Sequence, residues 1–220
     1  MLKGEIFNSR EGVLFWVTAT GEGKPNYNKD GREYVASIMF EKESDGFKHA
    51  TENINRLFHN TFGEKARMSN KCFRYCNSNG AYKNDVGEPI TESEATHVMF
   101  QFHTAVSQNG RQTVIAFYDA NTERFDIGNT LIGNGTIGNI SGQMVPYERG
   151  ANRGVSLFLR AIKIVKLVEY DPTPEFDSEE KSTVSDEEKF VAPKEENHFE
   201  EAVSQDVPEE TNKPATIKNL

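Results

Sequence analysis

A basic and aromatic stretch lies at residues 65–83, and its composition suits one kind of chemistry. The stretch contains no acidic residue, and its cations and rings are Lys65, Arg67, Lys71, Phe73, Arg74, Tyr75, Tyr82 and Lys83. Cations neutralise phosphates, and aromatic faces stack on unpaired bases with about 1–3 kcal/mol per base. The stretch therefore predicts a binding surface for single-stranded nucleic acid. A second group, within the segment PYERGANR, adds Tyr147, Arg149 and Arg153.

The direction in which these rings point has two alternatives. In an extended strand, Lys71, Phe73 and Tyr75 share one face and Arg74 lies on the other. The rings could point into the protein interior or lie on an open face. Because Lys71 shares their face, we expect Phe73 and Tyr75 to be on the open face, where they could stack on bases.

The segment LIGNGTIGN, residues 131–139, matches the Gly-x-Gly-x-x-Gly spacing of dinucleotide-binding turns. In those turns the glycines lead from a strand into a helix whose first N–H groups hold the pyrophosphate. Here Gly142, Pro146 and Gly150 follow at intervals that a helix does not tolerate. The segment therefore predicts a bent or bulged β-structure and no nucleotide cofactor.

Residue types that perform catalysis or bind metals do not cluster in the sequence. His97 and His103 lie on the polar face of one expected strand without a carboxylate pair, which favours solvated side chains. Cys72 and Cys76 are the only cysteines, and a structural zinc site usually needs four ligands. No nucleophile-elbow, phosphate-loop or zinc-protease motif is present. We predict no enzymatic activity, no metal and no cofactor, and reduced cysteines.

The elements that would position the basic stretch are mainly strands. Alternating apolar residues predict strands at 13–20, 34–40, 71–76, 96–106, 111–119 and 154–170, with a hairpin turn at 107–110. Helical spacing from Phe47 to Phe62 predicts one helix at about 46–61, started by Ser44 or Asp45 and ended by Gly63. Strands and helices do not alternate, so the fold class is mostly β: a small antiparallel barrel or a sandwich.

Charge is divided unequally along the chain. Residues 1–170 carry 20 Lys and Arg against 19 Asp and Glu, whereas residues 171–220 carry 5 against 15. The second part has few large apolar side chains, so burial cannot offset the entropy of ordering it. We predict a folded body at 1–170 and a disordered acidic tail at 171–220. The tail either solubilises the protein or acts as an interaction segment that competes with polyanions.

The order of these features resembles the single-stranded DNA-binding proteins of tailed bacteriophages. The resemblance rests on an early strand pair and helix before KCFRYCNSNGAYKNDVGEPI, on the glycine-rich block 133–170, and on the acidic tail. It implies an OB-fold-like antiparallel barrel with one inserted helix that binds single-stranded DNA in a groove. It also implies a tail that recruits replication proteins (polymerase, helicase or primase) and competes with DNA. One departure is the tail end ATIKNL, which lacks the terminal aromatic, so Phe190 or Phe199 would take that role.

The residues and the resemblance together predict a protein that binds single-stranded DNA without sequence specificity in phage DNA replication, recombination and repair. Expected partners are single-stranded DNA, replication proteins and, as a further candidate, a second copy in a homodimer; a preference for RNA stays open. No secretory signal or membrane span is apparent, so we expect the host cytoplasm. The alternative is a β-sandwich protein-interaction or virion structural protein with a solvated tail.

Overall fold

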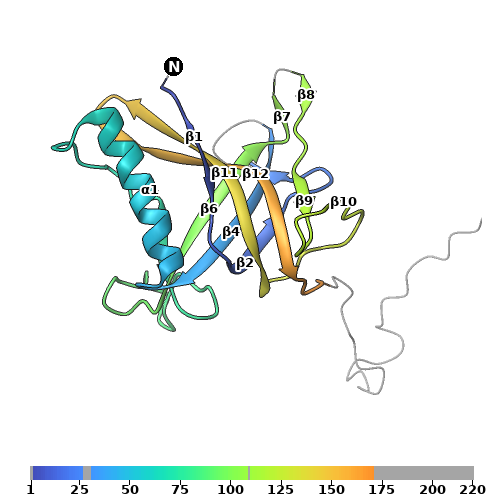
Figure 1. Ribbon diagram of the computed structural model, residues 1–220. Helices are drawn as coiled ribbons and strands as arrows, with labels where there is room; N and C mark the ends of the chain where they lie inside the picture. Colours follow the sequence, from blue (N-terminus) through green and yellow to red (C-terminus); the bar gives the residue numbers. More distant parts are fainter. Residues whose placement is uncertain (1, 27–30, 109, 171–220) are drawn as a thin grey trace, which may run out of the picture. The chain divides into compact units, whose positions relative to one another are not determined.

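Five strands close into a barrel (Figure 1). They are β2 (Gly12–Thr18), β4 (Arg32–Glu41), β6 (His97–Ala105), β11 (Thr136–Arg149) and β12 (Asn152–Lys166). Antiparallel pairs join β2 to β4, β4 to β6, β11 to β2 and β11 to β12, and a parallel pairing of β12 with β6 completes the ring. This is the Greek-key barrel of the OB fold. The predicted barrel is confirmed, and the sandwich of the alternative is wrong.

The computed structural model describes residues 2–26, 31–108 and 110–170 of the chain. All of the described residues belong to one compact unit. The acidic tail predicted at 171–220 lies outside the described residues.

Alternation along the barrel strands builds the main core. The even residues of β4 from Tyr34 to Phe40, together with Phe100 and Phe102 of β6, point inward and are buried. The helix α1 (Asp45–Phe62) packs Ala50, Ile54, Leu57 and Phe58 onto this core from one side of the barrel (Figure 1). The Ser44 hydroxyl accepts the Phe47 N–H at 3.4 Å, and Gly63 ends the helix at φ 89°. The predicted helix and both of its boundaries are confirmed.

A second, smaller cluster lies on the outer face of β2, β4 and β6. It consists of buried Phe15, Met39, Cys76 and Met99, with Val13 and Tyr82 packed against them. The strand β5 (Phe73–Cys76) pairs antiparallel with β6, and the loop after β5 covers the cluster. Gly80 in that loop lies so close to Phe15 that a Cβ atom would be 2.8 Å from its ring.

The glycine-rich segment enters β11, as predicted, and not a helix. Register shifts at Ile137/Gly138 and Ser141/Gly142 mark irregularities in its pairing with β12. A Cβ atom at Gly142 would lie 2.6 Å from the Phe158 carbonyl oxygen. A Cβ atom at Gly138 would lie still closer to the Lys163 carbonyl oxygen. Glycine is required at both positions because two backbones approach each other there.

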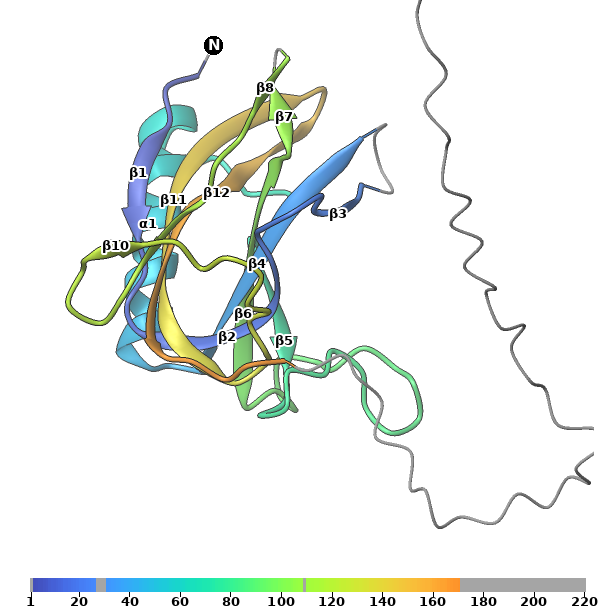
Figure 2. The ribbon, with the colours of Figure 1, turned by 90° about the vertical axis from the view of Figure 1, so that its right-hand side faces the viewer.

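The remaining strands differ from the prediction. Residues 111–119 do not form one return strand beside β6. Instead β7 (Ser107–Gln108) and β8 (Arg111–Gln112) make a two-stranded ribbon, while β9 (Ala116–Tyr118) pairs with β12 and with β10 (Arg124–Phe125). The short strands β1 (Glu5–Asn8), paired with β11, and β3 (Lys24–Pro25), paired with β4, were not predicted. Figure 2 shows β7, β8 and the β11–β12 turn at one end of the barrel and β5 at the other.

Candidate nucleic-acid interface

A groove of about 750 Å³ crosses the outer faces of β4, β6 and β12. Its lining includes Gln101 and His103 of β6, Ser156 and Phe158 of β12, Asn26 of the β2–β4 connection with Arg32 at the start of β4, and Tyr147, Arg149 and Asn152 beside the β11–β12 turn. We call it the main groove. In OB barrels, the face of the second and third barrel strands, flanked by the first connection and the last turn, is the surface that binds oligonucleotides. In this chain those strands are β4 and β6.

Two rings lie beside each other on the floor of the main groove. The His103 and Phe158 ring centroids are 5.5 Å apart, and His103 pairs with Phe158 where β6 meets β12. His103 Nδ1 lies 3.7 Å from a carboxylate oxygen of Glu33, whose side chain is only 16% exposed. This carboxylate also lies 4.0 Å from Lys24 Nζ. The floor therefore offers an aromatic surface with its one acid already paired.

The two arginines at the edges of the main groove differ in the contacts that their side chains make. Arg32 donates hydrogen bonds of 2.7 Å to the carbonyl oxygens of Glu22 and Gly23, so it holds the β2–β4 connection in place. Arg149 is exposed at the end of β11, and its guanidinium makes no ion pair or hydrogen bond with any described residue. Its guanidinium is therefore available for a phosphate, which it can bind with two parallel hydrogen bonds.

A strained tryptophan stands at a bulge in β2. Trp16 has φ 49° and is 40% exposed, and the pairing of β2 with β4 shifts register beside it. A positive φ is uncommon for a bulky residue and must be held by surrounding contacts. Here the Trp16 N–H donates to Asn134 Oδ1 at 2.8 Å. Asn134 lies between Gly133 and Gly135, so one role of the glycine-rich segment is to fix this bulge.

Two further side chains complete an aromatic surface around Trp16. The Trp16 and Tyr82 ring centroids are 5.0 Å apart, and the Arg74 guanidinium lies 5.2 Å from the Tyr82 centroid. Burial raises the pKa of Tyr82 to about 12, and the neutral hydroxyl donates to Met99 Sδ at 3.2 Å. Arg74 is exposed. We call Trp16, Tyr82 and Arg74 the Trp16 platform; it combines an accessible indole with a cation, as base stacking requires.

The Trp16 platform and the main groove belong to one face of the sheet. Val35 pairs with Thr18 of β2 and His103 of β6, and Ser37 pairs with Phe15 and Gln101. The platform lies at β2 and the groove floor at β6, two strand spacings or roughly 10 Å apart. A single extended strand crossing β2, β4 and β6 could therefore contact both.

The predicted basic stretch is divided between the two sides of β5. Phe73 packs against Phe47 of α1 at 5.3 Å and against Phe100 at 5.4 Å between centroids, and Tyr75 also packs on the core. Lys71 Nζ donates to the Tyr75 hydroxyl at 2.8 Å and lies 3.3 Å from Glu92, contacts that raise the pKa of Lys71. The expectation that Phe73 and Tyr75 lie on an open face is wrong, because α1 covers that side.

Only some of the other predicted site residues lie in the main groove or the Trp16 platform. Tyr147 and Arg149 line the main groove, and Arg74 and Tyr82 belong to the Trp16 platform. Arg153 instead forms a 2.6 Å ion pair with Glu148 and lies 5.5 Å from the Phe62 ring centroid. Lys65, Arg67 and Lys83 are exposed loop residues that belong to neither surface.

Among the rings of these surfaces, sequence reasoning missed three: Trp16, His103 and Phe158. His103 was expected to be solvated, and its side chain is 43% exposed, but it also stacks on Phe158. The available signal was Trp16 itself, the one tryptophan of the chain, on a strand beside a basic loop. The two cysteines are unpaired thiols, and burial raises the pKa of each to about 11.

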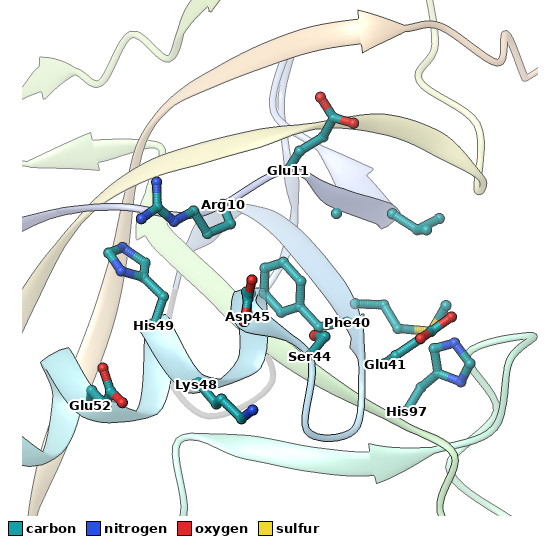
Figure 3. Close-up of a pocket in the computed structure, with 14 residues that line it drawn as sticks. Arg10, Glu11, Phe40, Glu41, Ser44, Asp45, Lys48, His49, Glu52 and His97 are labelled. Atoms are coloured by element: carbon teal, nitrogen blue, oxygen red, sulfur yellow. The ribbon is translucent and has the colours of Figure 1, made fainter.

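Another groove, of about 830 Å³, lies at the start of α1 (Figure 3). Arg10 and His49 lie at one side of it and Glu41 and His97 at the other, with Asp45 between them. Its lining mixes both charges and includes four carboxylates. Such a surface repels phosphates as much as it attracts them. Within the described ranges, no group of three His, Cys, Asp or Glu residues could hold a metal ion, and no helix is long and apolar enough to cross a membrane.

The fold and the two surfaces define an OB-type barrel with an aromatic, cation-edged face. The chain is similar in structure to gp2.5, a single-stranded DNA-binding protein encoded by bacteriophage T7, with a TM-score of 0.52 and 14% identity over 87% of this chain and 100% of that one. The single-stranded DNA-binding protein from bacteriophage Enc34 in complex with ssDNA matches with a TM-score of 0.48 and 13% identity, over 77% and 88% of the two chains. No protein-family model and no curated protein matches the sequence.

Proposed function

We propose that this protein binds single-stranded DNA without sequence specificity across the main groove and the Trp16 platform. The observation that carries the proposal is the position of the main groove, which lies on β4 and β6 between the β2–β4 connection and the β11–β12 turn. This is the oligonucleotide face of OB folds. The structural likeness to gp2.5, itself a single-stranded DNA-binding protein, supports it.

The contacts available fit unpaired bases better than a duplex. Trp16, Tyr82 and the His103–Phe158 pair present ring faces, which only unstacked bases can meet. Stacking tolerates every base because every base has a π-face. Arg149 and Arg74 can neutralise phosphates at the two ends of the path. Such a set discriminates single strands from duplexes and reads little sequence.

The test is the affinity of the full chain for labelled oligo-dT, measured by fluorescence anisotropy at two salt concentrations. A duplex of equal length and an oligonucleotide of mixed sequence serve as controls. We expect binding at low salt that weakens steeply as salt rises, a weaker duplex complex, and similar affinity for the mixed sequence. Equal affinity for duplex, or no binding at low salt, would refute the proposal.

The biological setting is part of the same proposal. We propose that the protein acts in phage DNA replication, recombination and repair in the host cytoplasm, without catalytic activity, with residues 1–170 as the DNA-binding domain. Residues 171–220, with their 15 acidic side chains, would contact a polymerase, helicase or primase and compete with DNA. A homodimer is a further proposed state. Removing residues 171–220 should tighten DNA binding, since it removes a net charge of −10; unchanged affinity would argue against competition.

A further inference from the structure

A second groove, of about 600 Å³, follows the outer face of β12 beyond the main groove. Its cations are Arg160 and Lys163, and its other polar side chains include Tyr118 of β9 and Asn139 of β11. We call it the β12 groove. None of its lining residues is acidic. Four other grooves on the described residues each contain a carboxylate: Glu33 in the main groove, Asp45 at the start of α1, and Glu169 and Asp126 in two more.

The pairing of β12 with β11 shifts register at Arg160, which lines this groove. Ser141 pairs with Ala161 and Gly142 with Leu159, so Arg160 has no partner on β11. Bulges of this kind redirect a side chain, and they are over-represented beside functional sites. Gly142 makes the bulge possible because the Phe158 carbonyl oxygen lies against its Cα, where a Cβ atom would be 2.6 Å away.

Both cations of the β12 groove have N–H groups that are available to a ligand. Arg160 is exposed, and its guanidinium makes no ion pair or hydrogen bond with the described residues. Lys163 is half-buried, and its Nζ donates one hydrogen bond, to Thr122 Oγ1 at 3.0 Å, which leaves two of its three N–H groups. The nearby Asp119 carboxylate already accepts the N–H groups of Asn121 and Glu123. The groove therefore has the charge and the donors of an anion site.

The β12 groove continues the main groove along one strand. Ser156 and Phe158 line the main groove, and Arg160, Ala161 and Lys163 follow them on the outer face of β12. Phe158 and Lys163 are separated by five residues of extended strand, or roughly 16 Å. A polynucleotide leaving the main groove beside Phe158 would meet Arg160 next.

We propose that the β12 groove binds phosphodiester groups of nucleic acid through Arg160 and Lys163. The inference rests on the proposed function and extends it to a second phosphate site on the barrel. The phosphates come either from the strand that fills the main groove or from a second strand.

The experiment compares the full chain with the double variant Arg160→Gln/Lys163→Gln. The matched control is Lys3→Gln/Lys166→Gln, which removes the same charge from two exposed lysines outside the groove. One OB fold covers roughly 4–16 nucleotides, so oligo-dT of about 6 nucleotides lies near the lower limit and oligo-dT of about 20 nucleotides exceeds the upper limit. Affinity is measured over a series of salt concentrations, and the annealing rate of two complementary strands is measured in parallel.

If one strand fills both grooves, the double variant binds the long oligonucleotide about tenfold more weakly than the control. The slope of log affinity against log salt then falls by about 1.4, since each single-strand phosphate contributes about 0.7. The short oligonucleotide is unaffected. If a second strand is the ligand, the long-oligonucleotide affinity is retained and annealing slows about tenfold relative to the control.

Equal behaviour of the double variant and the control in both assays would overturn the inference. Tighter DNA binding by the double variant would also overturn it, because an acidic segment would then be the occupant. Binding of the short oligonucleotide by the unmodified chain reports on the proposed function alone. If the unmodified chain binds neither oligonucleotide, both the proposed function and the second phosphate site are refuted.

Discussion

The two sides of β5 carry similar residue types but differ in how accessible their rings and cations are. On one side, Phe73 lies between Phe47 of α1 and Phe100 of β6, Tyr75 packs on the core, and Lys71 is engaged with Glu92. On the other side, Arg74 lies exposed over Tyr82 and beside Trp16. Both sides combine a cation with aromatic rings. Only the second leaves a ring face and a guanidinium accessible.

This difference shows that a basic-aromatic sequence does not define a binding surface by itself. A cation beside a ring is available to a ligand only when no carboxylate engages the cation and no helix covers the ring. Glu92 and α1 perform these two roles on the Phe73 side. On the Trp16 side the neighbouring loop adds Tyr82 without an acidic partner for Arg74 in the described part of the chain.

The largest expected effect is on stability, at the covered side. Phe73→Ala removes a ring that packs on Phe47, Tyr75 and Phe100, and we expect a loss of about 3 kcal/mol in the free energy of unfolding. Urea denaturation measures it. DNA affinity per folded molecule should be unchanged. A stable variant with weakened DNA binding would place Phe73 in the interface and reverse the comparison.

The next effect is on binding, at the open side. Trp16→Ala should weaken oligo-dT binding by about 2 kcal/mol, or roughly thirtyfold, because one stacking surface is lost. Trp16→Phe keeps a ring and should retain most of the affinity. Isothermal titration of the three proteins gives the comparison. An alanine variant with unchanged affinity would remove the Trp16 platform from the proposed interface.

Arg74 in β5 and Lys71 just before β5 should differ in their contribution to the salt dependence of DNA binding. Arg74→Gln should lower the salt slope of oligo-dT binding by about 0.7, the value for one single-strand phosphate. Lys71→Gln, the matched variant, should leave the slope unaltered because Lys71 is engaged by Tyr75 and Glu92. Equal slopes for the two variants would contradict the assignment of one open and one occupied side.

The smallest expected effect is on stability, at Ser37 of β4, the strand between the Trp16 platform and the floor of the main groove. The Ser37 hydroxyl is buried and has no hydrogen-bond partner among the described residues. Removing an unsatisfied polar group is nearly neutral or stabilising, so Ser37→Ala should change the free energy of unfolding by less than about 0.5 kcal/mol. Thermal denaturation checks this. A loss above about 1 kcal/mol would show that the hydroxyl has a partner.

Local patterns in the sequence predicted most of the fold. Helical spacing between Ser44 and Gly63 was enough to place α1, and alternation was enough to place β2, β4, β6 and β12. The strand β11 was expected only as bent or bulged β-structure in the glycine-rich segment. The path after β6 was missed because residues 113–115 leave the sheet before β9 joins β12 in parallel. A non-local pairing of this kind has no local signal.

The candidate site was less predictable than the fold, since it depends on which face another element covers. The choice between the two faces of β5 depends on the position of α1, which packs Phe47 against Phe73. Trp16 became a candidate only through its bulge and its contact with Asn134, more than a hundred residues away in sequence. Tyr147 and Arg149 were predicted from composition alone, and they line the main groove.

The emission of Trp16 tests the central claim most directly, because the chain contains a single tryptophan and the indole is 40% exposed on the platform. Titration of the full chain with oligo-dT at low salt should quench this emission to saturation, with the same midpoint as the anisotropy of labelled DNA, and added salt should restore it. DNA binding that is saturable by anisotropy while Trp16 emission stays unchanged would contradict the account, because the strand would then lie elsewhere on the protein.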